Sequence, residues 1–185
     1  MPAALLPRDE VVARILDVFR DCGYEGASIA DFSRATGLGK SSLYHYFPGG
    51  KDDMAIAVLE QIDTWMEQRA LAPLRAAGAP EKRLRAMIKA LDELYDGGKN
   101  ACVLGTLVLG GSRSRFQKYL KHSFGGWVDA LRDLAIEAGI KKSEAQHRAE
   151  DVVVRIEGAL ILAGAMDDPT PFKRALAHVE RDFLR

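Results

Sequence analysis

Apolar residues recur every three or four positions along most of the chain, the spacing typical of helices that each bury one face. The pattern predicts helices over residues 8–22, 29–36, 40–47, 51–72, 80–96, 116–138, 143–166 and 170–184. Residues 101–111 are almost wholly apolar and would permit a strand, but an isolated strand has nothing to pair with in a helical chain. A short buried helix is therefore predicted there, and the sequence predicts an all-α fold of about nine helices.

The segment from Ser28 to Lys51 carries the most specific local signals. Ser28 can cap a short helix, and Asp31, three residues later, can bond back to the cap. Gly37 suits the left-handed residue that ends this helix. In the next helix one face is apolar and the other is polar and aromatic. Two short helices joined by a glycine-containing turn form a helix-turn-helix, whose second helix fits the major groove of DNA.

The order of the predicted helices indicates two domains. The apolar stripe of residues 8–22 must bury against the two short helices, which makes residues 1–50 a three-helix head. A linking helix begins near Lys51, where Asp52 and Asp53 suit a helix N-terminus. Residues 51–185 then form an all-helical body.

Composition narrows the class of protein. The chain has 185 residues, 48% hydrophobic and 28% charged, which is typical of a soluble globular protein. No apolar run approaches the roughly 18 residues of a membrane-spanning helix. The first ten residues turn acidic too soon for a signal peptide, so a cytoplasmic location is expected. Cys22 and Cys102 lack metal-ligand spacing, and we expect free thiols, with no metal or cofactor.

The charge balance does not favour DNA binding. The chain has 26 basic and 26 acidic residues, whereas DNA-binding domains are usually basic. The positive charge of the helix-turn-helix is local instead, on Arg34, Lys40 and Lys51 against Asp31. The sequence therefore predicts few phosphate contacts per subunit.

The run TGLGKSSLYHYFPGGKDDM, Thr36 to Met54, resembles the helix-turn-helix of the TetR family of transcriptional repressors. The resemblance implies a homodimer that binds a palindromic operator in double-stranded DNA, and a body that holds a small-molecule effector. The Pro-Gly-Gly-Lys turn is one residue longer than the commonest family version. That turn and the Cys102–Gly105 segment resemble a subfamily of multidrug-efflux regulators typified by LmrA and YxaF.

The resemblance also implies roles for individual residues of the head. Lys40 and Ser41 would face base edges or nearby phosphates, and Tyr44 would lie against the groove. His45 and Tyr46 would touch the DNA backbone, while Lys51 and Ser28 would hold phosphates at helix N-termini. The predicted DNA-binding residues are Ser28, Lys40, Ser41, Ser42, Tyr44, His45, Tyr46 and Lys51.

Two further sets of residues are predicted in the body. In the family the last two helices pair with those of a second subunit, which assigns the dimer interface to Val152, Ile156, Ala159, Leu160, Ala163, Leu176 and Val179. These apolar faces could equally fill only the subunit core. The aromatic, methionine and cysteine residues of the body suggest an effector site at Trp65, Met66, Met87, Tyr95, Cys102, Phe124 and Trp127. Few buried charges are evident, which favours a mostly apolar effector, with His122 and Arg113 as candidate polar contacts.

Three alternatives remain open at this stage. Cys102 could act as a redox switch, although its apolar neighbours favour burial over reactivity. A helical protein-interaction module without DNA binding would have the same helical pattern. A small all-α enzyme is a third possibility, but the chain contains no metalloprotease, nucleophile-elbow or phosphate-loop motif.

Overall fold

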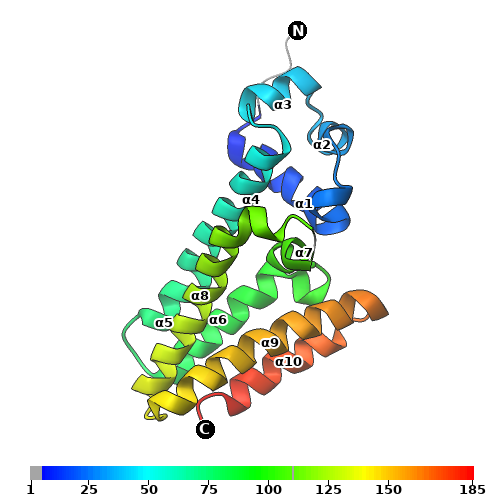
Figure 1. The fold of residues 1–185 in the computed structure, drawn as a ribbon. Coiled ribbons are helices and arrows are strands. Elements are labelled where there is room, and N and C mark those ends of the chain that lie inside the picture. Colours follow the sequence, from blue (N-terminus) through cyan, green and yellow to red (C-terminus); the bar gives the residue numbers. More distant parts are fainter. Residues whose placement is uncertain (1–5, 110) are drawn as a thin grey trace. The chain divides into compact units, whose positions relative to one another are not determined.

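The computed structural model describes residues 6–109 and 111–185. Residues 1–5, which belong to the segment considered for a signal peptide, and Gly110 of the apolar stretch lie outside the described residues. The described chain contains helices and no strand (Figure 1). Of its ten α-helical segments, α4 and α5 are joined by a π-helical turn into one helix, which gives nine separate α-helices in this part of the chain. The all-α prediction is confirmed.

The described chain divides into two compact units. Unit 1 comprises Met1–Asp63 and Val103–Gln117, and unit 2 comprises Thr64–Cys102 and Lys118–Arg185. The sequence pattern predicts a boundary near residue 50, with all of residues 51–185 in the body. In the structure residues 51–63 and 103–117 instead pack with the head, because α7 (Val103–Leu109) lies against α1 (Arg8–Gly26).

Unit 1 is built around the helix-turn-helix. Helix α1 packs on α2 (Ile29–Thr36), and α2 packs on α3 (Lys40–Tyr46). Phe19 and Phe32 lie with ring centroids 5.1 Å apart, and both are buried together with Leu43 and Phe47. This apolar contact fixes α3 by its inner face and leaves its outer face to solvent.

Unit 2 is a bundle of longer helices. It contains the end of α4 (Lys51–Met66), α5 (Ala72–Arg75), α6 (Pro80–Leu94), most of α8 (Arg113–Glu137), α9 (Lys142–Met166) and α10 (Thr170–Asp182). Figure 1 shows α9 and α10 side by side, and α10 also packs on α6. Leu84, Leu91, Ile156, Phe172 and Leu176 are among the core side chains.

The helix that begins at Lys51 does not end at Pro73, as the sequence pattern suggested. A π-helical turn over Glu67–Leu71 precedes Pro73, which then lies in the first turn of α5. Proline lacks an N–H and clashes with the carbonyl one turn earlier, and the wider π turn accommodates both effects. The helix continues to Arg75.

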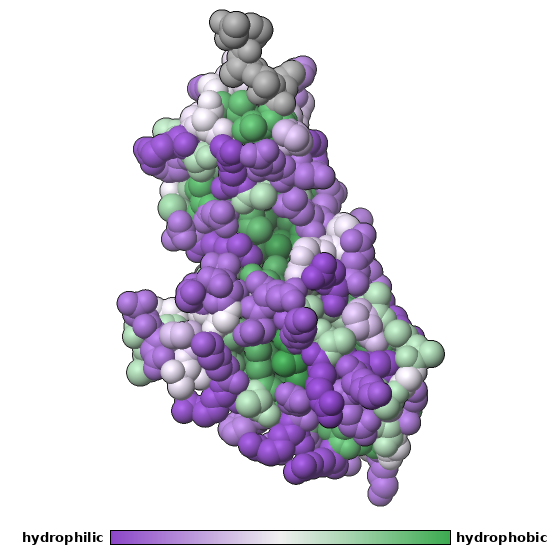
Figure 2. All heavy atoms as spheres, turned by 180° about the vertical axis from the view of Figure 1, so that it is seen from behind, coloured by the Kyte–Doolittle hydropathy of each residue, from purple (hydrophilic) through white to green (hydrophobic). Residues whose placement is uncertain are grey.

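Hydrophilic residues cover most of the face drawn in Figure 2, with smaller apolar areas between them. In the described residues no helix is long and apolar enough to cross a membrane.

Candidate nucleic-acid interface and ligand-binding residues

The start of α2 has the predicted capping box. The hydroxyl of Ser28 accepts a hydrogen bond from the Asp31 N–H (3.3 Å), and the Asp31 carboxylate accepts one from the Ser28 N–H (3.0 Å). These bonds with Ser28, aided by Arg34, lower the pKa of Asp31 below its usual value. Gly37 ends the helix with φ 73°, as predicted. The carboxylate of Asp31 therefore already lies at the helix N-terminus where Ser28 was expected to bind a phosphate.

Helix α3 presents its polar residues outward. Lys40, Ser41, Tyr44 and His45 are exposed, and Tyr44 keeps 40% of its surface accessible although it is aromatic. Ser42 is half-buried at the edge of this face. The Lys40 ammonium lies 6.0 Å from the Tyr44 ring, so charge and aromatic surface are adjacent. The arrangement provides hydrogen-bond donors of the kind that contact phosphates and base edges.

Two residues of the predicted DNA-binding set make bonds inside unit 1 instead. The Tyr46 hydroxyl donates to the Leu6 carbonyl (2.7 Å). The Lys51 ammonium donates to the carbonyls of Tyr24 (2.8 Å) and Ala27 (3.0 Å) and lies 4.5 Å from the Tyr24 ring. These are carbonyls at the end of α1, where a cation is stabilised by the helix dipole. The expectation that Lys51 holds a phosphate is thus corrected to a bond that ties α4 to α1.

The turn between α3 and α4 supports Tyr44. Gly50 has φ +70°, and a Cβ atom there would lie 3.4 Å from the Tyr44 ring. The N–H of Gly49 donates to the Asp53 carboxylate (2.5 Å), which caps the start of α4. The additional glycine of this turn lets the backbone approach Tyr44 closely.

A polar cluster joins α1, α4 and α8 within unit 1. The Tyr24 hydroxyl donates to Asp52, and the Arg115 guanidinium donates to the other carboxylate oxygen of Asp52 (2.5 Å). Burial and the bond to Asp52 raise the pKa of Tyr24 to about 12. The bond from Tyr24, aided by Arg115, lowers the pKa of Asp52. The N–H of Ser112 donates to Glu25 (2.6 Å) beside this cluster.

The seven predicted effector residues all lie in unit 2. Met66, Met87, Tyr95, Cys102 and Trp127 are buried, while Trp65 and Phe124 are half-buried. The two candidate polar contacts, His122 and Arg113, are exposed. Burial is compatible with an interior binding site and equally with plain core packing, so the effector set remains a prediction.

Sequence reasoning missed a half-buried acid, Glu157 of α9, whose Oε1 atom is fully covered. Burial raises the pKa of Glu157 to about 7, and a hydrogen bond with Cys102 lowers it only in part. Few buried charges are evident from the sequence of the body, and Glu157 is one that the sequence pattern did not reveal. Glu157 lies at the edge of the apolar face that contains Val153 and Ile156, which the helical spacing could have indicated. Cys102, the candidate redox residue, is only 7% exposed.

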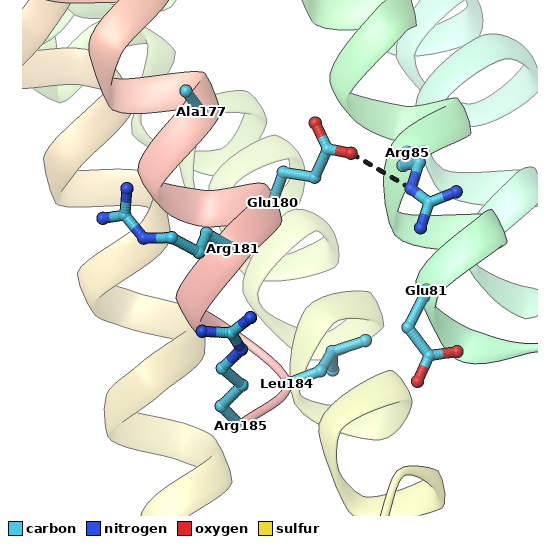
Figure 3. Close-up of a pocket in the computed structure, with 7 residues that line it drawn as sticks. All are labelled: Glu81, Arg85, Ala177, Glu180, Arg181, Leu184 and Arg185. Carbon is cyan, nitrogen blue, oxygen red and sulfur yellow. Dashed lines mark ion pairs between the residues drawn. The ribbon is translucent and has the colours of Figure 1, made fainter.

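A groove of about 400 Å³ lies on the surface between α6 and α10 (Figure 3). An ion pair between Arg85 and Glu180 (3.0 Å) crosses it, and the two side chains point toward each other. The lining residues are Glu81, Arg85, Ala177, Glu180, Arg181, Leu184 and Arg185. None of the seven predicted effector residues is among them, and this charged groove does not suit an apolar ligand.

The predicted dimer residues lie inside the subunit. Val152, Ile156, Ala159, Leu160, Ala163, Leu176 and Val179 are each at most 9% exposed. The large apolar side chains that α9 leaves at the surface are instead Val154 (69%), Ile161 (60%), Leu162 (45%) and Met166 (60%). The first set therefore belongs to the subunit core, and the second set is accessible on the surface of α9. Val154 and Ile161 lie about half a turn around the helix from the core face, and Leu162 and Met166 lie between these two faces.

Comparison with known proteins agrees with this geometry. Residues 12–58 match the sequence family described as bacterial regulatory proteins, tetR family, and residues 76–178 match the transcriptional regulator LmrA/YxaF-like C-terminal domain. The HTH-type transcriptional regulator LmrA of Bacillus subtilis is 23% identical over 168 residues, which are 89% of each chain.

Solved structures share the fold. Regulatory protein TetR from Rhodobacter sphaeroides aligns with a TM-score of 0.82 at 23% identity, over 96% of this chain and 98% of its own. A cysteine mutant of the TetR-family regulator CifR, determined with 26bp double-strand operator DNA, aligns with a TM-score of 0.77 at 19% identity, over 98% and 99% of the chains.

A helix-turn-helix with an exposed polar second helix, followed by a helical body, defines a DNA-binding transcriptional regulator rather than an enzyme. The chain belongs to the TetR family, and its C-terminal part is of the LmrA/YxaF-like type.

Proposed function

We propose that this protein is a cytoplasmic repressor that binds a palindromic operator as a homodimer and releases it when a small effector binds unit 2. The observation that carries the DNA-binding part is the outer face of α3, where Lys40, Ser41, Tyr44 and His45 are exposed above a buried Leu43. A dimer would place two such helices about 34–36 Å apart, in successive major grooves.

The proposed DNA contacts are Ser41 and Tyr44 in the groove and Lys40 at base edges or nearby phosphates, with His45, Ser42 and the start of α2 at Ser28 toward the backbone. Tyr46 and Lys51 are left out because their polar atoms bond within unit 1. With about four phosphates neutralised per dimer, affinity should fall with salt at a log–log slope of about −4. The head carries few basic residues, which supports this small number of neutralised phosphates.

The homodimer part rests on α9 and on the family. An apolar surface on α9 is exposed to water, which is energetically unfavourable. It is formed by the side chains of Val154, Ile161, Leu162 and Met166. Pairing of this surface with a second copy would remove it from water.

The effector part rests on family membership and on the buried residues of unit 2. The effector need only bind the DNA-free conformation more tightly than the operator-bound one, and a coupling of about 1–3 kcal/mol changes DNA affinity about 5- to 150-fold.

The test is titration of labelled duplex DNA from immediately upstream of the gene, at two salt concentrations, with a matched pair of variants. Tyr44→Phe and Tyr46→Phe each remove one hydroxyl, exposed in the first case and bonded to Leu6 in the second. Tyr44→Ala completes the series. We expect Tyr44→Ala to abolish tight binding, Tyr44→Phe to weaken it, and Tyr46→Phe to leave operator affinity unchanged.

Equal binding by all four proteins, and only at low salt, would contradict a sequence-reading role for α3. A dimer with no salt-sensitive affinity for duplex DNA would instead favour the protein-interaction module.

A further inference from the structure

Unit 2 contains four fully covered polar side-chain atoms that have no hydrogen-bond partner in the described structure: Nε and Nη2 of Arg83, Nε1 of Trp127 and Oε1 of Glu157. Trp127 is 2% exposed. Buried polar groups in folded proteins are nearly all paired, so each exception requires a physical explanation. The Arg83 atoms differ, because this guanidinium forms an ion pair with Glu137 (2.6 Å) and donates through Nη1 to the carbonyls of Leu74 and Ala76.

Of Trp127 and Glu157, Glu157 is the more informative because its side chain can carry a charge. Among the described residues the Cys102 thiol is the one titratable group that acts on the carboxyl group of Glu157, and burial raises its pKa to about 7. No basic side chain of the described chain compensates its negative charge. Arg155, two residues earlier on α9, is exposed and lies 3.3 Å from His178 instead. A carboxyl group in this setting lacks a cation.

We propose that Glu157 recognises the effector, and that the effector is an organic cation, an apolar frame carrying a protonated amine that binds the Glu157 carboxylate. The inference rests on the proposed function, because it deepens the effector site of unit 2. One residue of the predicted effector set supports the location, because Cys102 hydrogen-bonds to Glu157.

The chemistry distinguishes a cation from other ligands. An ammonium donates a charge-assisted hydrogen bond to a carboxylate, about twice as strong as a bond between neutral groups. A neutral alcohol can satisfy Oε1 but leaves the negative charge without compensation, and an anion is repelled. When the cation binds the protonated acid, the carboxyl proton passes to solvent and an ammonium–carboxylate pair remains.

The experiment uses three naphthalene compounds of similar shape with the full-length protein at pH 8. They are 1-naphthylmethylamine, which is cationic, 1-naphthalenemethanol, which is neutral, and 1-naphthylacetate, which is anionic. Calorimetric titration should show the amine binding wild type about tenfold more tightly than the alcohol, as one charge-assisted bond implies. The acetate should bind most weakly.

Glu157→Gln keeps the shape of the side chain and removes its charge, so the amine and the alcohol should then bind equally. Glu150→Gln is the matched control. Glu150 lies on the same helix, exposed, and accepts a bond from Gln146 (2.6 Å), so this variant should retain the wild-type preference.

Acidity provides a second readout. With the Glu157 pKa at about 7, amine affinity should be about tenfold lower at pH 6 than at pH 8, because the carboxyl group must lose its proton. The alcohol, and the amine with Glu157→Gln, should show no such change. Equal affinity of amine and alcohol for wild type, a preference that survives Glu157→Gln, or no binding of any compound would overturn the proposal.

The outcome is separable from that of the proposed function. Operator binding with no charge preference would remove this inference alone. A Glu157-dependent charge preference in a protein that binds no DNA would support the ligand site and contradict the regulator.

Discussion

The guanidinium of Arg115, in the first turn of α8, lies 2.5 Å from the carboxylate of Asp52, in the first turn of α4. The Asp52 carboxylate also accepts a hydrogen bond from the hydroxyl of Tyr24, which lies on α1. Three helices of unit 1 therefore meet at one carboxylate. The segment that contains Arg115 comes from the middle of the chain, so this ion pair joins distant parts of the sequence.

Removal of this ion pair should destabilise unit 1 modestly. Both side chains are about half-exposed, so a double-mutant cycle with Asp52→Asn and Arg115→Ala should give a coupling of about 0.5–1 kcal/mol in urea unfolding. Arg113→Ala is the control, because Arg113 lies two residues earlier and is exposed. Its coupling free energy with Asp52→Asn should be too small to measure. Additive effects of Asp52→Asn and Arg115→Ala would show that the pair contributes nothing.

Two glycine substitutions should change stability in opposite directions. Gly50→Ala places a side chain at φ +70° and 3.4 Å from the Tyr44 ring, and should cost about 1 kcal/mol or more and weaken operator binding. Gly125→Ala, in the interior of α8 with no atom within 4 Å of its Cβ, should stabilise by about 0.5–1 kcal/mol. Thermal unfolding of both variants measures the difference, and a stabilising Gly50→Ala would contradict the close approach to Tyr44.

Lys40 and Lys51 should respond differently to removal of charge. Lys40→Ala removes an exposed cation of α3, and should reduce the salt slope of operator binding by about 2 per dimer, one per subunit. Lys51→Met removes two hydrogen bonds to α1 carbonyls and should lower stability by about 1–3 kcal/mol with the slope unchanged. A Lys51→Met protein that is stable but has a reduced slope would restore the phosphate role.

Glu157 should make stability depend on pH. Its pKa is about 7 in the folded protein and about 4.3 in an unfolded chain, so the folded state binds more protons between these values. Stability is therefore greatest below about pH 4.3, falls as pH rises to about 7, and is level above that, with a total contribution of about 3–4 kcal/mol. The difference between wild type and Glu157→Gln in urea unfolding at pH 5 and pH 8 isolates this contribution from that of other groups. The same difference at both pH values would indicate that Glu157 has an ordinary pKa.

The apolar surface of α9 predicts how the dimer can be broken. Ile161→Glu puts a charge on a side chain that is 60% exposed, and light scattering should detect monomers if a second copy covers it. Ile136→Glu is the control, because Ile136 of α8 is also exposed (37%) but lies outside the proposed interface. Loss of the dimer with both variants, or with neither, would contradict pairing through this surface.

The sequence by itself determined the features that depend on nearby residues. The capping box of Ser28 and Asp31, the left-handed Gly37 and the two faces of α3 were all predicted, because each rests on spacings of three or four residues within one turn. The family resemblance carried by residues 36–54 was likewise correct.

Only the tertiary structure decided where long side chains point and which segments pack together. Lys51 and Tyr46 have the residue types of DNA contacts, yet carbonyls of α1 and of Leu6 accept their hydrogen bonds. Glu157 looks like a surface residue in sequence, but packing covers its Oε1 atom and brings the carboxyl group to Cys102. The physical reason is common to all three. Their partners lie between 24 and 55 residues away along the chain, and no local pattern encodes contacts between segments that folding alone brings together.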